Sequence, residues 1–332
     1  MSTALKPILL LCALLALAGC GGDSGSDRPN EEASLLLDFT PNGVHAGIYL
    51  ATSRGFDDAE GVTLDVRAPS ASTDALRLLQ GGRADMAILD IHDLGLARET
   101  GSHPPDIVGV MAVVQRPLAS VLAQPEVRRP RDLEGSRVGV TGLASDVAVL
   151  RSVVAGDGGD PSRVRTTTIG FEAVKALVAG RVDGATAFWN VEGVALREQR
   201  PDMREFRVDD FGAPAYPELV LCVTRDTLEE KRDVIAATIR ALQRGYTQTQ
   251  NDPESAVTAL VDADSGLDRE AAQAQLDAVA PAFTAGARAY GELREDVLRE
   301  WAAWDVEFGI LKEQPEVGEA FDTSLVGPVA NP

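Results

Sequence analysis

The sequence predicts an α/β protein of two lobes, each built on a mostly parallel sheet flanked by helices, with a ligand cleft between the lobes. Three observations predict this fold. A helix–glycine–strand pattern occurs twice, short apolar strands alternate with helical stretches, and the last third of the chain is mainly helical. A chain of 332 residues is also long enough to form two cores.

The N-terminus has the features of a secretory signal. Lys6 precedes an apolar run from Ile8 to Leu17, which is too short to span a membrane. The run ends in Leu-Ala-Gly-Cys, which resembles a bacterial lipobox, although an ordinary cleaved signal or a chance apolar start remains an alternative. We expect residues 1–19 to be removed and Cys20 to be lipidated. Its acyl chains would anchor the exported protein to the outer face of the cell membrane.

The rest of the mature chain divides into a tether and two lobes. Residues 20–33 are polar and begin with a glycine- and serine-rich stretch, so we expect a flexible tether there. The first lobe is expected at residues 34–120 and 211–332, and the second at residues 121–210, because the chain passes into the second lobe and then returns.

The first expected strand ends in an unusual set of polar residues. Residues 35–51, LLLDFTPNGVHAGIYLA, begin as a buried strand and then place a carboxylate, an aromatic ring, an amide and an imidazole before a helix. A plain turn is one explanation, since Asp, Pro, Asn and Gly are common turn residues. The other is a ligand at the carboxyl end of the strand, where such sites form in open α/β sheets.

The repeated pattern defines equivalent units in the two lobes. Residues 74–90 read DALRLLQGGRADMAILD, and residues 171–190 read FEAVKALVAGRVDGATAFWN. Each unit has a helical stretch, the motif Gly-Arg-x-Asp-x-Ala and an apolar strand, and Gly82 and Gly180 fit helix C-caps. Further strands are expected at residues 62–66, 107–114, 138–140 and 219–223, helices at 146–154 and 191–197, and a mainly helical segment at 227–308.

Composition and motifs exclude several classes of function. A net charge of −20 argues against nucleic acid as a partner. The three histidines lack metal-ligand spacing, and hydrolase-elbow, phosphate-loop and dinucleotide-binding motifs are absent. Cys222 is then the one cysteine left to the mature domain, and we expect a small buried hydrophobe with no disulfide. We predict no catalytic residue, no metal and no cofactor, and we expect a monomer.

Three stretches together resemble a known family. LDFTPNGVHAGIYLA, GFEAVKALVAGRVDGATAFWNVEGV and FRVDDFGAPAYPELVL are similar to segments of the substrate-binding lipoproteins of ABC importers, in particular those that collect pyrimidine precursors of thiamine. The resemblance runs from about Leu35 to Leu311. It implies the type II periplasmic binding protein fold, a small heteroaromatic amine as ligand, and ABC permease and ATPase subunits as partners.

In the first lobe the resemblance implies four ligand-binding residues. Asp38 and Phe39 match a family segment that usually reads Asp-Trp, so Phe39 keeps an aromatic face for stacking and loses the indole donor. Asn42 would bond ring nitrogens or an amine, and His45 would face the cleft. Core packing of Phe39 and a turn or capping role for Asn42 and His45 are the alternatives.

In the second lobe the resemblance points to the end of the second repeat. Trp189 is expected to stack on the ligand, with Asn190 beside it, and Glu192 to bond an amino group. Tyr216, in the returning crossover, would line the cleft or stiffen the hinge. Two more residues, Ser145 and Asp146, begin a helix, where capping and binding of a polar ligand group are both open.

One position departs from the family pattern. Relatives often have a tyrosine near the end of the strand that follows Asp85, whereas this chain has Asp90 and His92. We include Asp90 among the binding residues, and the change suggests a larger or more basic heterocycle.

Two rival functions remain. Fungal-type pyrimidine synthases resemble this chain in Gly-Arg-x-Asp-Met, but they need a nearby lysine for pyridoxal phosphate and a cysteine-rich crossover. Residues 85–93 contain no lysine and residues 213–222 only one cysteine. The other rival is a receptor for a flavin-like heteroaromatic or an alkylsulfonate, but carboxylates such as Asp38 and Glu192 would repel an anion. The sequence therefore predicts a binding module without catalysis that closes its lobes around the ligand.

Overall fold

The structure is a computed structural model that describes residues 29–71, 73–99 and 106–327. The expected signal peptide, the expected lipidation site Cys20 and most of the expected tether lie outside the described residues. The first strand, β1, begins at Glu31, so the end of the expected tether is already part of a sheet. Within the described ranges, no helix combines the length and apolar character needed to cross a bilayer.

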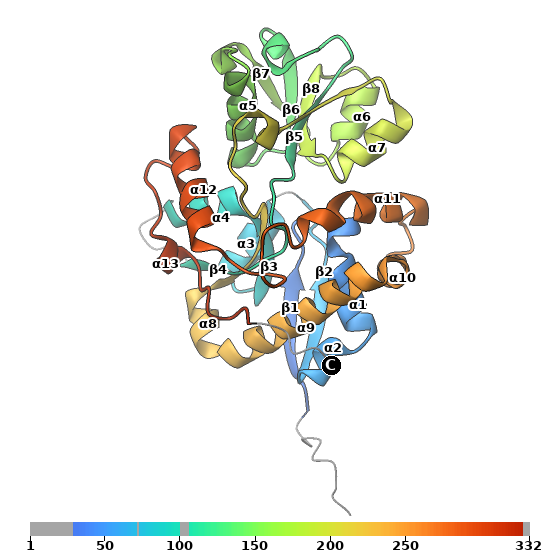
Figure 1. Cartoon of the computed structure of the whole chain (residues 1–332), viewed down its shortest axis with the longest axis vertical. Coiled ribbons are helices and arrows are strands. Elements are labelled where there is room, and N and C mark those ends of the chain that lie inside the picture. The colour runs from blue at the N-terminus through green and yellow to red at the C-terminus, as the bar shows by residue number, and fades with distance from the viewer. Residues whose placement is uncertain (1–28, 72, 100–105, 328–332) are drawn as a thin grey trace, which may run out of the picture.

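The first sheet has the strand order β2-β1-β3-β10-β4 and forms the lower lobe in Figure 1. Four of its strands come from the first part of the chain, and β10 comes from far along it. The elements of this part are β1 (Glu31–Leu36), α1 (Ala46–Ser53), α2 (Phe56–Ala59), β2 (Val62–Arg67), α3 (Asp74–Gln80), β3 (Met86–Asp90), α4 (Ile91–Glu99) and β4 (Ile107–Ala112), with β10 at Leu219–Thr224.

The second sheet has the strand order β7-β6-β8-β5-β9 and forms the upper lobe. Its elements are β5 (Ala119–Ala123), β6 (Arg137–Val140), α5 (Ala144–Gly156), β7 (Arg165–Thr168), α6 (Ala173–Val178), β8 (Gly184–Phe188), α7 (Glu192–Gln199) and β9 (Arg204–Arg207). Two segments connect the sheets, residues 113–118 and residues 208–218, which we call the first and second crossovers (Figure 1). We propose that the lobes divide within these crossovers.

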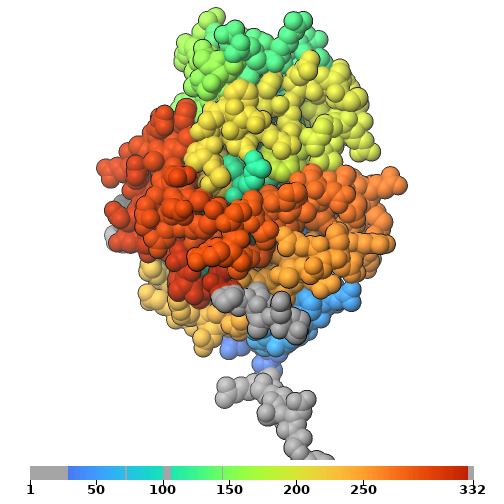
Figure 2. All heavy atoms as spheres, viewed as in Figure 1, coloured from blue at the N-terminus to red at the C-terminus, as the bar shows by residue number. Residues whose placement is uncertain are grey.

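The last third of the chain is helical and packs mainly on the first sheet. It contains α8 (Arg225–Glu230), α9 (Arg232–Asn251), α10 (Pro253–Ala263), α11 (Arg269–Val279), α12 (Glu295–Glu307) and α13 (Val317–Ala320). In Figure 2 this part, coloured orange to red, covers much of the lower lobe on the face shown. Helix α11 also contacts α7, so the C-terminal part reaches the second lobe.

Each sheet is mostly parallel, as the sequence predicted, and contains one reversed strand. β1 is parallel to β2 and β3, and β6 is parallel to β7 and β8. In contrast, β10 runs antiparallel to β3 and β4, and β5 runs antiparallel to β8 and β9. The strands β5 and β10 are the reversed ones, because each enters its sheet straight from a crossover and not from a βα unit.

The repeated motif has the same structure in both lobes. Gly82 and Gly180 both have φ of 63°, the left-handed conformation that glycine adopts most easily. After α3, Arg83 N donates to Leu78 O at 2.9 Å, and after α6, Arg181 N donates to Ala176 O at 2.9 Å, which closes each helix in the same way. The following aspartates, Asp85 and Asp183, then accept hydrogen bonds from the neighbouring strands.

Each motif aspartate joins the strand it precedes to the adjacent strand. Asp85 Oδ2 accepts from Ser34 N at 2.8 Å in β1, and Asp183 Oδ2 accepts from Arg137 N at 2.8 Å in β6. The motif thus fixes the register of β3 against β1 and of β8 against β6. It brings the carboxyl ends of β3 and β8 to the space between the two sheets.

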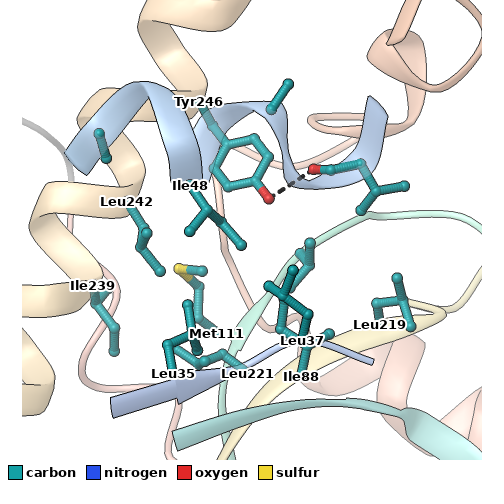
Figure 3. Packing of buried hydrophobic residues seen from close by; sticks show 14 of the residues in the cluster. Leu35, Leu37, Ile48, Ile88, Met111, Leu219, Leu221, Ile239, Leu242 and Tyr246 are labelled. Carbon is teal, nitrogen blue, oxygen red and sulfur yellow. Dashed lines mark hydrogen bonds between the residues drawn. The ribbon is translucent and has the colours of Figure 1, made fainter. Parts of the chain in front are cut away.

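The core of the first lobe is packed between its sheet and the helices α1 and α9 (Figure 3). Leu35 and Leu37 lie beside Ile88 and Leu221, and Tyr246 closes the cluster, donating its hydroxyl to Val44 O at 2.8 Å. This bond satisfies a buried hydroxyl group, which would otherwise lose its solvation at a cost. Cys222 is buried and free, as predicted. The packing holds the end of β1, where the site begins.

Candidate functional site

A cavity lies between the two sheets and is lined by residues of both lobes. Its empty volume is about 850 Å³, part of which is open to solvent. That is within the usual range for small-molecule sites. Of the sequence-predicted residues, six line it: Asp38, Phe39, Asp90, Ser145, Asp146 and Glu192. Asn42, His45, Trp189, Asn190 and Tyr216 are not among the lining residues.

Asp38 follows β1 and is held in place by His45. Asn42 N donates to His45 Nδ1 at 3.2 Å, so the proton of a neutral ring is on Nε2, which donates to Asp38 Oδ1 at 2.9 Å. Asn42 in turn caps the short helix after it, accepting from Val44 N at 2.9 Å. Of the two roles left open for Asn42 and His45, the geometry supports the turn and capping role. They position Asp38 and do not face the cavity.

A group of acids from both lobes lines the cavity. Asp90 ends β3, Asp93 is one turn further along α4, and Asp146 is in the first turn of α5 in the other lobe. Burial raises the pKa of Asp146 and raises the pKa of Asp90 and Asp93 well above the usual value. Repulsion by Glu218 and Asp146 raises the pKa of Asp90 further, and repulsion by Asp90 and Asp146 raises that of Asp93 further. These carboxyls are therefore protonated more easily than surface acids.

The acids are partly satisfied by hydrogen bonds from backbone and side-chain donors. Thr141 donates its backbone N–H to Asp146 Oδ2 at 2.6 Å, and Ser145 hydrogen-bonds Asp93 across the cleft. Ser145 is thus a lining residue that links the lobes, whereas Asp146 is a lining acid that also holds the loop before its helix. Within the described residues no lysine or arginine lines the cavity.

Glu192 adds a fifth carboxyl group at the start of α7. It accepts from Phe188 N at 3.2 Å. Burial raises its pKa to about 7, and the nearby Asp146 and Asp38 also raise it. Near neutral pH this side chain can accept a hydrogen bond from an amine as a carboxylate or donate one as an acid, depending on its surroundings.

Three phenylalanine rings complete the lining. Phe39 comes from the first lobe, and Phe171 and Phe188 come from the second. The rings of Phe39 and Phe171 meet edge to face with centroids 4.3 Å apart. Planar apolar surfaces next to carboxyl groups suit a flat heterocycle that carries N–H donors.

Trp189 does not have the position expected of a stacking residue. Its indole Nε1 donates to Pro117 O at 3.0 Å, its backbone N–H donates to Leu118 O at 3.0 Å, and the Arg207 guanidinium lies 4.1 Å from the ring centroid. Successive side chains of a strand point to opposite sides. Phe188, the last residue of β8, faces the cavity, so Trp189 points away and packs on the first crossover.

Asn190 and Tyr216 are also buried outside the lining. Asn190 is 0% exposed and neither of its side-chain polar atoms has a hydrogen-bond partner. Tyr216, in the second crossover, is 0% exposed and its hydroxyl lies 3.1 Å from His92 Nε2. Of the two roles left open for Tyr216, the geometry supports the structural one at the hinge.

Several lining residues were missed by the sequence analysis. Phe188 occupies the position of the second repeat that Asp90 occupies in the first, eight residues after the motif glycine in each case. That register was available from the sequence. Asp93 was also within reach, one helical turn after Asp90. Phe171 and Thr186 carried no comparable signal, because their approach to the cavity depends on how the two lobes face each other.

Comparisons with known proteins show the family of this chain. A family model described as NMT1/THI5 like matches residues 42–256. The chain is 34% identical over 260 residues to the formylaminopyrimidine-binding protein of Halalkalibacterium halodurans, covering 77% of this chain and 78% of that protein. It is 24% identical over 240 residues to the 4-amino-5-hydroxymethyl-2-methylpyrimidine phosphate synthase of Legionella pneumophila, covering 69% and 73%.

Solved structures with the same fold include transport receptors. The alkanesulfonate-binding protein SsuA from Xanthomonas axonopodis pv. citri superposes with a TM-score of 0.70 at 16% identity, covering 89% of this chain and 99% of that chain. The nitrate-binding protein NrtA from Synechocystis PCC 6803 gives 0.69 at 11% identity, covering 89% and 87%. At such identities the likeness shows the fold alone. The chain therefore belongs to the NMT1/THI5-like family and has the type II periplasmic binding protein fold.

Proposed function

We propose that this protein is the extracytoplasmic substrate-binding component of an ABC importer and that it captures a small heteroaromatic amine such as formylaminopyrimidine or another thiamine pyrimidine precursor. The observation that carries the proposal is the cavity between the lobes. It combines five carboxyl groups, three phenylalanine rings and, among the described residues, no cationic side chain.

The chemistry of the cavity favours an amine over an anion. Burial makes each ionised carboxyl costly unless a donor or a positive charge compensates for it, and a protonated or amino-bearing ring supplies both. A sulfonate or nitrate would instead meet Asp38, Asp90 and Asp146 with no lysine or arginine among the described lining residues to balance its charge, and would be repelled wherever these acids are ionised. The phenylalanine rings would pack against the faces or edges of a planar ligand, which contributes about 1 kcal/mol per aromatic pair.

We infer binding without catalysis. Synthase chemistry on pyridoxal phosphate requires an amine that forms a Schiff base. Of the lysines in the described residues, Lys175 pairs with Glu172 and Lys231 with Asp85, and neither these nor Lys312 lines the cavity. Cys222 is buried in β10, where burial raises the pKa of its thiol, so it is not a reactive nucleophile.

Export and anchoring form part of the proposal. The family resemblance and the N-terminal sequence support a receptor held by acyl chains at Cys20 on the outer face of the cell membrane, from which it delivers ligand to permease and ATPase subunits as a monomer. Replacement Cys20→Ser should move the protein from the membrane fraction to the soluble exported fraction, whereas Cys222→Ser should leave it on the membrane.

A thermal-shift panel tests the ligand class. Purified protein without its signal is heated with formylaminopyrimidine, riboflavin, an alkanesulfonate or pyridoxal phosphate, since a ligand that binds the native state raises the midpoint. We expect the pyrimidine to raise it most. A shift with the alkanesulfonate alone would contradict the proposal, as would a borohydride-trapped adduct of pyridoxal phosphate with a lysine.

A further inference from the structure

Glu218, which follows Tyr216 and Pro217 at the end of the second crossover, is a buried acid that does not line the cavity. It is 0% exposed. Its Oε2 accepts from Leu118 N at 2.6 Å and from Ala119 N at 2.9 Å, where the first crossover enters β5. One carboxylate oxygen thus joins the two segments that connect the lobes.

The other oxygen of Glu218 faces a lining residue of the cavity. Oε1 is buried and accepts no hydrogen bond from an N–H or hydroxyl donor of the described residues. The Glu218 side chain instead hydrogen-bonds the Asp90 carboxyl, which two ionised carboxylates, both acceptors, cannot do. Carboxylate oxygens of Asp90 and Glu218 and a ring nitrogen of His92 all lie within 4.8 Å of one another. Asp90 also pairs through its backbone with Leu219, the residue after Glu218. A buried, unsatisfied oxygen beside a second carboxyl group requires a proton between them.

We propose that Glu218 is a positioning residue that shares a single proton with Asp90 and so fixes a carboxyl group of the cavity relative to both crossovers. Through this link, occupation of the cavity at Asp90 is transmitted to the segments that must bend when the lobes move. The effect on the ligand rests on the proposed function. The shared proton does not, and it is testable in the ligand-free protein.

The charged groups around Asp90 and Glu218 are compatible with one proton shared between the two carboxyls. His92 is held by Asp305, with Nδ1 to Oδ1 at 2.8 Å, and its other nitrogen faces Tyr216. Burial lowers the pKa of His92, but Asp305 and Asp90 outweigh this and raise it to about 10, so the ring is cationic. Burial raises the pKa of Asp90 and of Glu218, and the His92 charge opposes that rise in both. The titratable groups that face the pair, or its neighbours His92 and Tyr216, are His92 and Asp93 of α4, Asp146 of α5, Asp209 and Tyr216 of the second crossover, and Asp305 of α12.

Proton linkage in unfolding tests the shared proton. Acids whose folded pKa is raised keep their proton in the native state and lose it on unfolding, so their contribution to stability is present below the unfolded pKa and is lost as pH rises through the folded pKa. From urea unfolding of the ligand-free protein between pH 6 and 9, we expect Glu218→Gln and Asp90→Asn each to lower the number of protons released on unfolding by about one. The double variant should lower it no further.

A variant of an exposed acid is the control for this measurement. Asp262→Asn removes an exposed acid and should leave the linkage unchanged. A decrease of about two protons in the double variant would show two independent acids and would overturn the proposal. So would a stoichiometric divalent cation in the purified protein, measured by mass spectrometry, because the cation would replace the proton. If Glu218→Gln does not fold, Asp90→Asn alone decides. An unchanged number of protons released on unfolding in that variant would overturn the proposal.

Ligand binding separates positioning from simple packing. Glu218→Gln keeps an oxygen for Leu118 and Ala119 and offers an N–H to Asp90, so its affinity for formylaminopyrimidine should stay within about threefold of wild type. Glu218→Ala lacks both and should bind about tenfold or more weakly. Equal loss in both variants would overturn the positioning role. Absence of binding in the wild-type protein would instead count against the proposed function.

Discussion

Phe39 and Phe171 meet across the cleft, with ring centroids 4.3 Å apart and an angle of 71° between the ring planes. Phe39 follows β1 of the first lobe, and Phe171 precedes α6 of the second. Both rings line the cavity. The contact joins the two lobes at the site itself, so any change in how the lobes face each other changes this aromatic surface.

Removing one of these rings should weaken ligand binding. Phe171→Ala takes away a stacking or edge contact and is expected to lower the affinity for formylaminopyrimidine about tenfold, which corresponds to ~1.4 kcal/mol. Isothermal titration calorimetry measures this. Val178→Ala, at an exposed position of α6, is the matched control and should not change affinity. Equal affinity of wild type and Phe171→Ala would place the ligand away from the ring.

Asp38 should matter both directly and through His45. Asp38→Asn replaces a carboxylate oxygen with an amide nitrogen that cannot accept the ligand's N–H, and we expect about a tenfold to hundredfold loss of affinity, since bonds to charged groups are worth about 1.5–3 kcal/mol. His45→Gln lacks the imidazole that holds Asp38 and should have a smaller effect in the same direction. A larger loss in His45→Gln than in Asp38→Asn, by calorimetry, would reverse these roles.

The contribution of Glu192 should depend on pH. Burial raises its pKa to about 7, above about 4.3 for an unperturbed glutamate, so ionisation costs native stability as pH rises through 7. The ionised form is the stronger acceptor for an amine. We therefore expect the affinity ratio of wild type to Glu192→Gln to be near one at pH 6 and to rise about tenfold by pH 8.5.

Dividing the affinity of the wild type by that of Glu192→Gln removes the effect of the ligand's own protonation, because the same ligand is titrated into both proteins at each pH. Calorimetry at four or five pH values is sufficient. A ratio that is constant across this range would mean that Glu192 does not bind the ligand in its ionised form.

Trp189 should affect stability more than affinity. Trp189→Ala removes a buried ring, its bond to Pro117 and its contact with Arg207. Truncation of a buried aromatic side chain costs about 3–5 kcal/mol. We expect a large fall in the urea midpoint, while protein that remains folded binds ligand with affinity closer to wild type than Phe171→Ala does. A tenfold loss of affinity with unchanged stability would restore the stacking role that the sequence suggested.

The sequence predicted the architecture well where local signals repeat. The two Gly-Arg-x-Asp motifs identified equivalent strands, and the structure gives both motifs the same helix ends and the same aspartate bonds. The direction of β5 and β10 was not predictable in the same way. It depends on which lobe the chain has just left, and no residue pattern records that.

The site was predicted as a region more reliably than as individual side chains. Asp38, Phe39, Asp90, Ser145, Asp146 and Glu192 line the cavity, since each follows or begins an element at the cleft edge. The one-residue difference between Phe188 and Trp189 reverses the side of the strand that faces the ligand. His45 and Tyr216 were recognised as important polar groups, but only three-dimensional contacts show that they support other residues.

The most direct measurement is a calorimetric titration of the wild-type protein with formylaminopyrimidine, with an alkanesulfonate titrated in parallel. We predict saturable binding of one pyrimidine per protein with a Kd of about 1 μM or tighter, equivalent to about −8 kcal/mol, and no binding of the sulfonate. Saturable binding of the sulfonate without binding of the pyrimidine would contradict the proposal that this acidic, aromatic cavity captures a heterocyclic amine.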